Sequence, residues 1–130
     1  MGEARPAGVT LDAGALIAFE RGDDRMRALV RLVHERDLSL VIPAGVLGQV
    51  WRDGSRQARL AILVGSSAIS VEVLDAALAK AAGALCGRAG TADVIDATVV
   101  LAARARGTTI ITSDPSDMVR LDPNVEIEAI

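Results

Sequence analysis

Short runs of apolar and β-branched residues alternate with longer helical segments, and this alternation constrains the fold more than any other feature of the chain. The runs "GVTLD" (8–12), "LSLVI" (38–42) and "TTIIT" (108–112) are predicted as strands, "AISVEVL" (68–74) is β-like, and "VEIEAI" (125–130) is a possible edge strand. Strands that alternate with helices favour a parallel sheet with helices on both faces. We therefore expect one α/β domain over residues 1–130, a three-layer sandwich with a short, mostly parallel central sheet flanked by helices.

The segments between these strands carry helical periodicity or helix-boundary residues. The predicted helices are "AGALIAFERG" (13–22), "DDRMRALVRLVHERD" (23–37), "PAGVLGQVWRD" (43–53), a helix that Ser55 caps and that runs to about Val64, "DAALAKAAGALCG" (75–87), "TADVIDATVVLAARARG" (91–107) and "DPSDMVRL" (114–121). Past its first turn, the segment 91–107 is apolar nearly all the way round. This pattern predicts a helix buried inside the domain.

Composition excludes several classes of protein. A hydrophobic content of 51% is too high for a disordered chain, and no apolar run reaches the ~18 residues of a membrane span. The N-terminus has no apolar signal-peptide core, and the single cysteine, Cys86, allows neither an internal disulfide nor a cysteine cluster for zinc. We expect a soluble, cytoplasmic protein without a membrane partner.

The charge and aromatic content argue against a simple basic nucleic-acid binder. The net charge is -3, and the only aromatic residues are Phe19 and Trp51, which provide no stacking platform for bases. We expect His34 to be a surface residue and Trp51 to pack in the core or in an interface. Arg52, Arg56 and Arg59 have helical spacing, but "DGS" (53–55) is expected to break that helix and leave them as solvated surface residues.

Aspartates follow two of the predicted strands. Asp12 and Asp114 stand at or just past the carboxyl ends of strands, where parallel sheets place their sites. Each also has a structural explanation, because either can cap the helix that follows it, and Pro115 suits the first turn after such a cap. Asp93 lies in the first turn of the predicted helix 91–107, where the helix dipole stabilises a negative charge.

Asp96 is harder to explain by capping. It lies about 60° around the helix from Asp93, and the turns that follow it are apolar. The nearest basic residues in sequence are Arg88 and Arg104. A buried carboxylate without a partner costs several kcal/mol or becomes protonated. We therefore expect the fold to bring together Asp12, Asp93, Asp96 and Asp114, with Asp12, Asp96 and Asp114 as oxygen ligands of a hard cation, Mg²⁺ or Mn²⁺.

The ordered segments "VTLDAGALIAF", "IPAGVLGQVWR", "ADVIDATVVLAARARG" and "IITSDPSDMVRL" resemble the PIN-domain family, in particular VapC-like toxin ribonucleases. The resemblance covers essentially the whole chain. It implies an acidic quartet that binds one or two Mg²⁺ or Mn²⁺ ions and hydrolyses RNA to a 5′-phosphate and a 3′-hydroxyl. Asp12, Asp96 and Asp114 match its first, third and fourth members, and Asp93 matches an additional acid of some members. For Asp117 we expect a capping role, and for Thr112 and Ser113 local hydrogen bonds at the strand end.

The chain differs from the family pattern at the second member of the acidic quartet. The family pattern places Glu in the helix after the second strand, and "PAGVLGQV" has Gln49 at this position. Glutamine keeps an oxygen ligand and loses the charge. Three possibilities stay open: Asp93 compensates, the site holds one ion, or catalysis is lost and the domain is a catalytically weakened RNA-binding or interaction module. The resemblance also implies a homodimer and a cognate small antitoxin protein.

A receiver domain of the response-regulator type is the main rival from another class, because it is also small, α/β and acidic at its strand ends. Such a domain needs a lysine on a late strand, whereas Lys80 falls in the predicted helix 75–87. A dinucleotide site is excluded because no Gly-x-Gly-x-x-Gly motif follows a strand.

Overall fold

A computed structural model describes residues 7–130 and contains a five-stranded sheet in which every pairing is parallel. The strand order is β3-β2-β1-β4-β5. The strands are β1 (Gly8–Leu11), β2 (Ser39–Pro43), β3 (Ile69–Glu72), β4 (Thr109–Thr112) and β5 (Ile127–Ala129). The predicted edge strand is therefore present, as β5. Because the chain runs outward from β1 to β3 and then returns to the other side of β1, the sheet has its topological switch point between β1 and β4.

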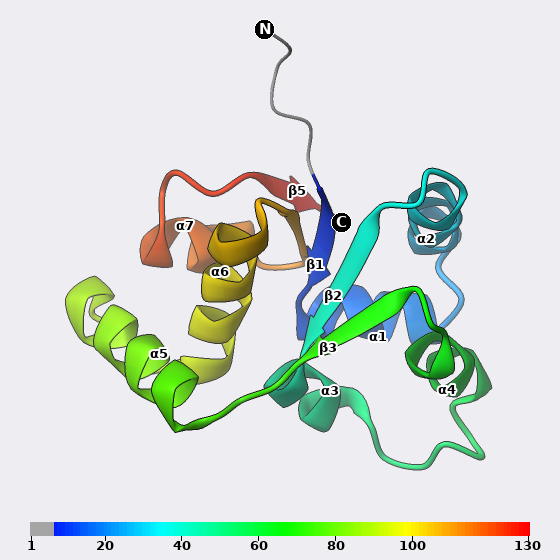
Figure 1. Ribbon diagram of the computed structural model, residues 1–130, viewed down its shortest axis with the longest axis horizontal. Helices are drawn as coiled ribbons and strands as arrows, with labels where there is room; N and C mark the ends of the chain where they lie inside the picture. Colours follow the sequence, from blue (N-terminus) through cyan, green and yellow to red (C-terminus); the bar gives the residue numbers. More distant parts are fainter. Residues whose placement is uncertain (1–6) are drawn as a thin grey trace, which may run out of the picture.

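Within residues 7–130, seven helices form the outer layers of the sandwich. The bounds are α1 (Ala13–Glu20), α2 (Asp24–Glu35), α3 (Ala44–Val50), α4 (Ala58–Gly65), α5 (Ala76–Ala89), α6 (Val94–Arg106) and α7 (Pro115–Leu121). Helices α5, α6 and α7 lie on one side of the sheet and α1, α2 and α4 on the other (Figure 1). Helix α3 contacts α1 in one layer and α6 in the other. The predicted three-layer α/β fold is confirmed.

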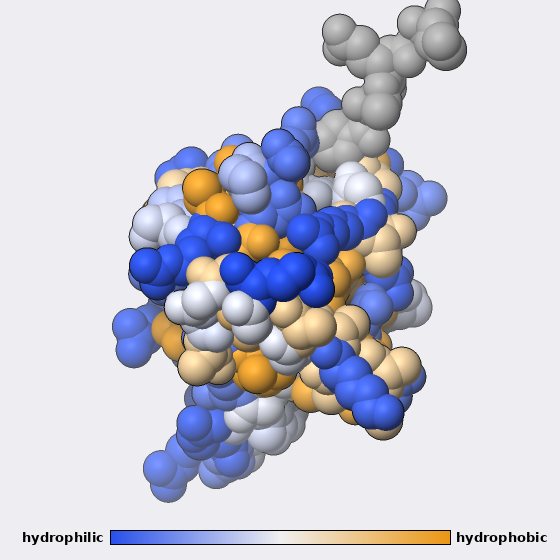
Figure 2. All heavy atoms as spheres, turned by 90° about the vertical axis from the view of Figure 1, so that its left-hand side faces the viewer, coloured by the Kyte–Doolittle hydropathy of each residue, from blue (hydrophilic) through white to orange (hydrophobic). Residues whose placement is uncertain are grey.

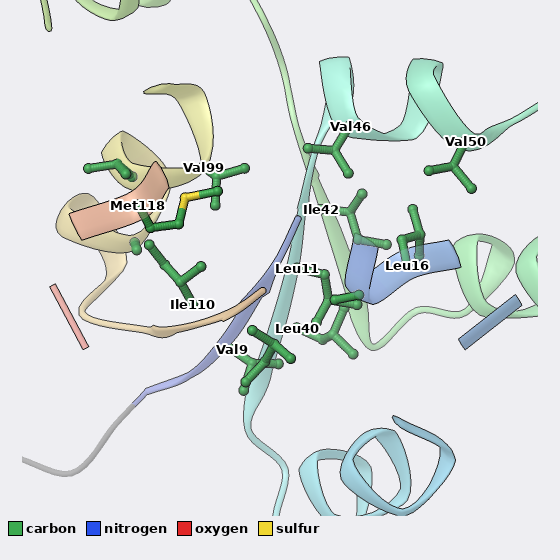
Figure 3. Packing of buried hydrophobic residues seen from close by; sticks show 14 of the residues in the cluster. Val9, Leu11, Leu16, Leu40, Ile42, Val46, Val50, Val99, Ile110 and Met118 are labelled. Carbon is green, nitrogen blue, oxygen red and sulfur yellow. The ribbon is translucent and has the colours of Figure 1, made fainter. Parts of the chain in front are cut away.

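The core forms on both faces of the sheet. Val99 of α6 and Met118 of α7 lie on one side of the strands, and Leu16 of α1 and Val46 of α3 lie on the other (Figure 3). All four side chains are fully buried. The interior position predicted for the helix 91–107 is confirmed, because residues 97–100 of α6 are buried and α6 contacts β1, β2 and β4.

The predicted cap of α4 is wrong, and of the two places expected for Trp51 the core is excluded, while an interface stays a prediction. Ser55 does not cap α4, which begins only at Ala58 without a side-chain cap; the Ser55 hydroxyl instead donates to Asp53 at 2.7 Å. Trp51 is 39% exposed and lies outside the core, and a Cβ at Gly54 would contact its ring. Both details follow from the early end of α3 at Val50, after which the chain turns.

Three other expectations hold. Lys80 lies on α5 and is exposed, which removes the receiver-domain rival, and His34 is exposed on α2. The arginines at 52, 56 and 59 are exposed and do not share a helix. Within residues 7–130, no helix combines the length and the apolar character of a membrane span.

Candidate functional site

Asp12 stands at the end of the central strand β1, next to the switch point. Its side chain caps α1, because Oδ1 accepts the backbone N–H of Ala15 at 2.8 Å. Oδ2 accepts a hydrogen bond from the hydroxyl of Thr112, the last residue of β4. The residue is only 4% exposed. The sequence left two alternatives for Asp12, a cap of the following helix or a site residue at the carboxyl end of a strand. Asp12 caps α1 and also lies at the carboxyl end of β1.

Asp114 follows β4 and precedes α7, and its side chain does not cap that helix. Its backbone N–H donates to the hydroxyl of Thr112 at 2.8 Å, which fixes the main chain and leaves the carboxylate exposed. The expected capping role of Asp117 is also absent, since α7 has no side-chain cap. Both carboxylates are therefore available to a ligand.

Asp93 and Asp96 stand at the start of α6. Asp93 is the N-cap, and its Oδ1 accepts the backbone N–H of Asp96 at 2.9 Å. The thiol of buried Cys86 on α5 donates to the backbone oxygen of Asp93 at 3.4 Å, which ties the end of α5 to this turn. Asp93 is exposed, whereas Asp96 is half-buried.

Burial and neighbouring negative charge raise the pKa of Asp96 to about 7. Desolvation is the largest cause, followed by the charge of Asp93 and a hydrogen bond with it, and then by the charges of Asp12 and Asp117. Asp12 and Asp96 therefore lie close enough to affect each other, although they are far apart in sequence. Asp117 also contributes negative charge near Asp96. In the sequence, the only indication of this role is the position of Asp117 three residues after Asp114.

Desolvation also raises the pKa of Asp12, and the charge of Asp114 adds to the increase. Hydrogen bonds from Thr112, Ala15 and Ser113 act in the opposite direction, because they stabilise the carboxylate. None of the four ion pairs found within residues 7–130 involves Asp12, Asp93, Asp96 or Asp114. The acids thus share one electrostatic environment in which their charge is not neutralised by an ion pair.

Gln49 lies in α3, is exposed, and occupies the helix that faces the start of α6. A Cβ at Gly45 would overlap Cδ1 of Ile95, so Gly45 abuts the first turn of α6. Gln49 is one turn further along the same face of α3, because residues four apart share a face. Gln49 therefore lies on the side of α3 that carries the contact with α6.

Five acids lie close enough to affect one another's ionisation, but they do not form a compact metal site. They are Asp12, Asp93, Asp96, Asp114 and Asp117. Within the described part of the chain, no three His, Cys, Asp or Glu side chains are arranged as a ready metal site. The donor set nevertheless fits a hard cation, because it consists of carboxylate oxygens with unneutralised charge. Mutual repulsion between ionised carboxylates is the feature that a divalent cation relieves.

A cavity lies elsewhere, between α2 and α4 on the opposite helix layer. Its volume is about 440 Å³, and none of the five acids lines it. The wall contains apolar side chains that include Val30, Leu40 and Leu63, and the basic residues Arg27, Arg31, His34 and Arg59. The cavity is therefore amphipathic and separate from the acids at the switch point.

A family model of the PIN domain matches residues 9–122, a range that includes all of the acids discussed here. A comparison with curated protein sequences gives no match.

Solved structures share the fold. The chain is similar to the structure of VapBC2 from Rickettsia felis bound to a DNA fragment from its promoter, with a TM-score of 0.71, 17% identity and coverage of 94% of this chain and 98% of that chain. It is also similar to VapC20 of Mycobacterium tuberculosis, a toxin that cleaves the sarcin-ricin loop, with a TM-score of 0.64, 22% identity and coverage of 85% and 94%. FitAB bound to the IR36 DNA fragment gives a TM-score of 0.63 at 13% identity, with coverage of 93% and 94%.

Proposed function

The chain belongs to the PIN-domain family, and from this premise we propose that it is a Mg²⁺- or Mn²⁺-dependent endoribonuclease, the cytoplasmic toxin of a toxin–antitoxin pair. One observation carries the proposal: burial and neighbouring like charges raise the pKa of Asp96 to about 7, and Asp93, Asp12 and Asp117 supply those charges. Groups with perturbed pKa values cluster at functional sites. VapC20, with the same fold, is a toxin that cleaves the sarcin-ricin loop.

In this proposal, Asp12, Asp96 and Asp114 hold the cation, and Asp93 and Gln49 complete the site. The cation, when bound, stabilises the negative charge that develops on the phosphodiester during hydrolysis. Asp93 and Asp114 are exposed, so either carboxylate can orient the attacking water. Asp12 is held by Ala15 and Thr112 and keeps a fixed orientation. The products are a 5′-phosphate and a 3′-hydroxyl.

The alternative is a catalytically weakened PIN-like domain that binds RNA or a protein. The observation that favours it is Gln49, a neutral side chain one turn beyond Gly45, which abuts Ile95 of α6. One fewer carboxylate weakens the attraction for a second cation. The two functions differ in a single measurable property, which is RNA cleavage.

The test is cleavage of total cellular RNA by the purified chain with Mg²⁺, with Mn²⁺ or with EDTA. We expect cleavage that requires the cation, yields 5′-phosphate ends and is lost in Asp96→Asn. The control is Asp24→Asn, which removes an exposed acid from the first turn of α2, away from the site. A folded chain that binds RNA but cleaves none with either cation would support the alternative.

The cavity between α2 and α4 supports the antitoxin partner. It combines apolar lining with Arg27, Arg31, His34 and Arg59, and is thus complementary to an amphipathic segment with acidic residues. Ile62, 75% exposed, extends the apolar surface at its edge. Arg31→Glu should weaken binding of the antitoxin and leave RNA cleavage by the free chain unchanged. The neighbours VapBC2 and FitAB are themselves two-component complexes with DNA.

The face that carries α5 supports the proposed homodimer. Figure 2 shows this side of the molecule, where hydrophobic and pale residues interrupt the hydrophilic ones. The outer positions of α5 include exposed Ala77, Ala81 and Ala84, and a Cβ at Gly83 would meet no other atom within 4 Å. Small residues allow close approach of a second helix. Ala81→Glu should therefore shift a dimer toward monomer in size-exclusion chromatography with light scattering.

A further inference from the structure

Thr112, the last residue of β4, joins the two strand ends that carry Asp12 and Asp114. The side chain is fully buried. Its hydroxyl donates to Oδ2 of Asp12 and accepts the backbone N–H of Asp114 at 2.8 Å. A hydroxyl has one donor and two acceptor lone pairs, so both bonds form at once. One side chain of β4 therefore contacts both acids that flank the switch point.

The strands do not need this hydroxyl in order to pair. The backbone N–H of Asp12 donates to the oxygen of Ile111 at 3.2 Å, and the N–H of Ile130 donates to the oxygen of Thr112 at 3.0 Å. Main-chain bonds therefore hold β4 on both sides. What the hydroxyl adds is control of a side chain: with Ala15 on Oδ1 and Thr112 on Oδ2, both carboxylate oxygens of Asp12 are fixed, by α1 and by β4.

We propose that Thr112 is a positioning residue of the acidic site, whose hydroxyl orients the Asp12 carboxylate and couples it to the loop that carries Asp114. The inference rests on the proposed function, because it concerns how the site holds a divalent cation. Groups that orient ligands in this way change metal affinity by about 10–100-fold when they are removed. The buried side chain of Thr112 also contributes to packing, whereas its hydroxyl acts on the two acids.

The same pair of strands offers a matched control. Thr10 of β1 and Thr108, which precedes β4, are also buried, and their hydroxyls bond to each other at 2.6 Å. Thr108 lies at the opposite end of β4 from Thr112. Thr108→Val therefore removes a buried hydroxyl bond between the same two segments and leaves Asp12 and Asp114 untouched.

The experiment is titration of the full chain with Mn²⁺ alone by isothermal calorimetry, with thermal unfolding of each variant alongside. We expect Thr112→Val to bind Mn²⁺ at least about tenfold more weakly than the wild type, and Thr112→Ser to stay within about threefold because it restores the hydroxyl. Thr108→Val should lose stability and keep wild-type affinity. Thr112→Ala, which removes atoms without adding any, replaces Thr112→Val if that variant does not fold.

Wild-type affinity in Thr112→Val would overturn the inference while leaving the proposed function intact. Equal loss of affinity in Thr112→Val and Thr108→Val would also overturn it, because the effect would then come from general destabilisation. The same holds if neither Thr112→Val nor Thr112→Ala folds, since Thr112 would then be structural. A wild-type chain that binds no Mn²⁺ would instead contradict the proposed function itself.

Discussion

The backbone N–H of Asp96 donates to the Asp93 carboxylate at 2.9 Å, so the residue that caps α6 also holds its negative charge beside Asp96. The cap satisfies an N–H group that would otherwise lack a partner at the start of the helix. The same carboxylate disfavours ionisation of half-buried Asp96. The Asp93 carboxylate thus stabilises the start of α6 and, at the same turn, disfavours the ionised form of Asp96.

The first prediction concerns stability after Asp96→Asn. Because the pKa of Asp96 in the folded state is about 7, above its ordinary value of 3.8, the folded chain binds this proton more tightly than the unfolded chain. The wild type therefore loses stability as the pH rises from about 4 to about 7, and the loss is complete above that range. Asn removes the ionisation, so at pH ~8 the variant should be more stable by about 1–2 kcal/mol, less than full conversion of the shift because Asp96 is only half-buried.

Urea unfolding at about pH 5 and about pH 8 measures this difference. The gain in Asp96→Asn should be smaller at the lower pH, where most of the Asp96 side chains in the folded wild type are already protonated. Asp24→Asn, an exposed acid of α2, should show no such dependence. An equal gain at both pH values would mean that ionisation of Asp96 is not the cause.

The second prediction concerns cation affinity and pH. A cation must displace the proton that Asp96 carries below about pH 7, so binding should release protons and weaken as the pH falls. Mn²⁺ affinity should decrease by up to about tenfold per pH unit below this value and level off above it. Calorimetry in two buffers of different ionisation enthalpy counts the protons. Affinity that does not vary between about pH 5 and about pH 8 would exclude Asp96 as a ligand.

The third prediction concerns Gln49→Glu. Gln49 lies one turn beyond Gly45, which abuts Ile95 at the start of α6, so a carboxylate here adds charge near the acids. We expect Mn²⁺ to bind about tenfold more tightly, equivalent to about 1.4 kcal/mol. Ala28→Glu adds the same charge on the exposed surface of α2 and should leave the affinity unchanged. If Gln49→Glu also has no effect, Gln49 is not part of the site.

The fold was predictable because its elements carry independent signals. The apolar residues of β1 predict a buried strand, and the apolar body of α6 predicts a buried helix. Both predictions come from the residue types alone, and both elements are buried in the structure. The end of α3 at Val50 was not predictable in this way, because the turn that follows depends on Gln57, whose side chain accepts the N–H groups of Arg52 and Asp53. Contacts between residues of this kind have no periodic signature.

The site was predictable to a similar depth. The sequence identified Asp12 and Asp96 from their places at a strand end and at the head of a buried helix, and the structure brings their charges together. It could not reveal that Asp117 contributes charge, because a first-turn acid has the same pattern whether it caps a helix or faces a site. The role of Thr112 depends on the register of β1 and β4, which only the folded chain provides.

The last prediction concerns Gly14, the second residue of α1. A Cβ at Gly14 would overlap Oγ of Ser113 and lie 2.7 Å from its Cβ, and 3.5 Å from Oδ1 of Asp12. Ser113 follows β4, and its backbone hydrogen bond stabilises the Asp12 carboxylate. Gly14→Ala should therefore displace Ser113, cost about 1–3 kcal/mol of stability and weaken Mn²⁺ binding.

Two further variants separate this clash from a general effect of removing a helical glycine. Gly83→Ala places a methyl group in open space on α5, and should raise stability by about 0.5–1 kcal/mol without changing Mn²⁺ affinity. The double variant Gly14→Ala with Ser113→Gly removes both clashing atoms and should recover most of the lost stability. If Gly14→Ala loses stability but still binds Mn²⁺ like the wild type, the approach of α1 to the β4–α7 loop does not shape the site.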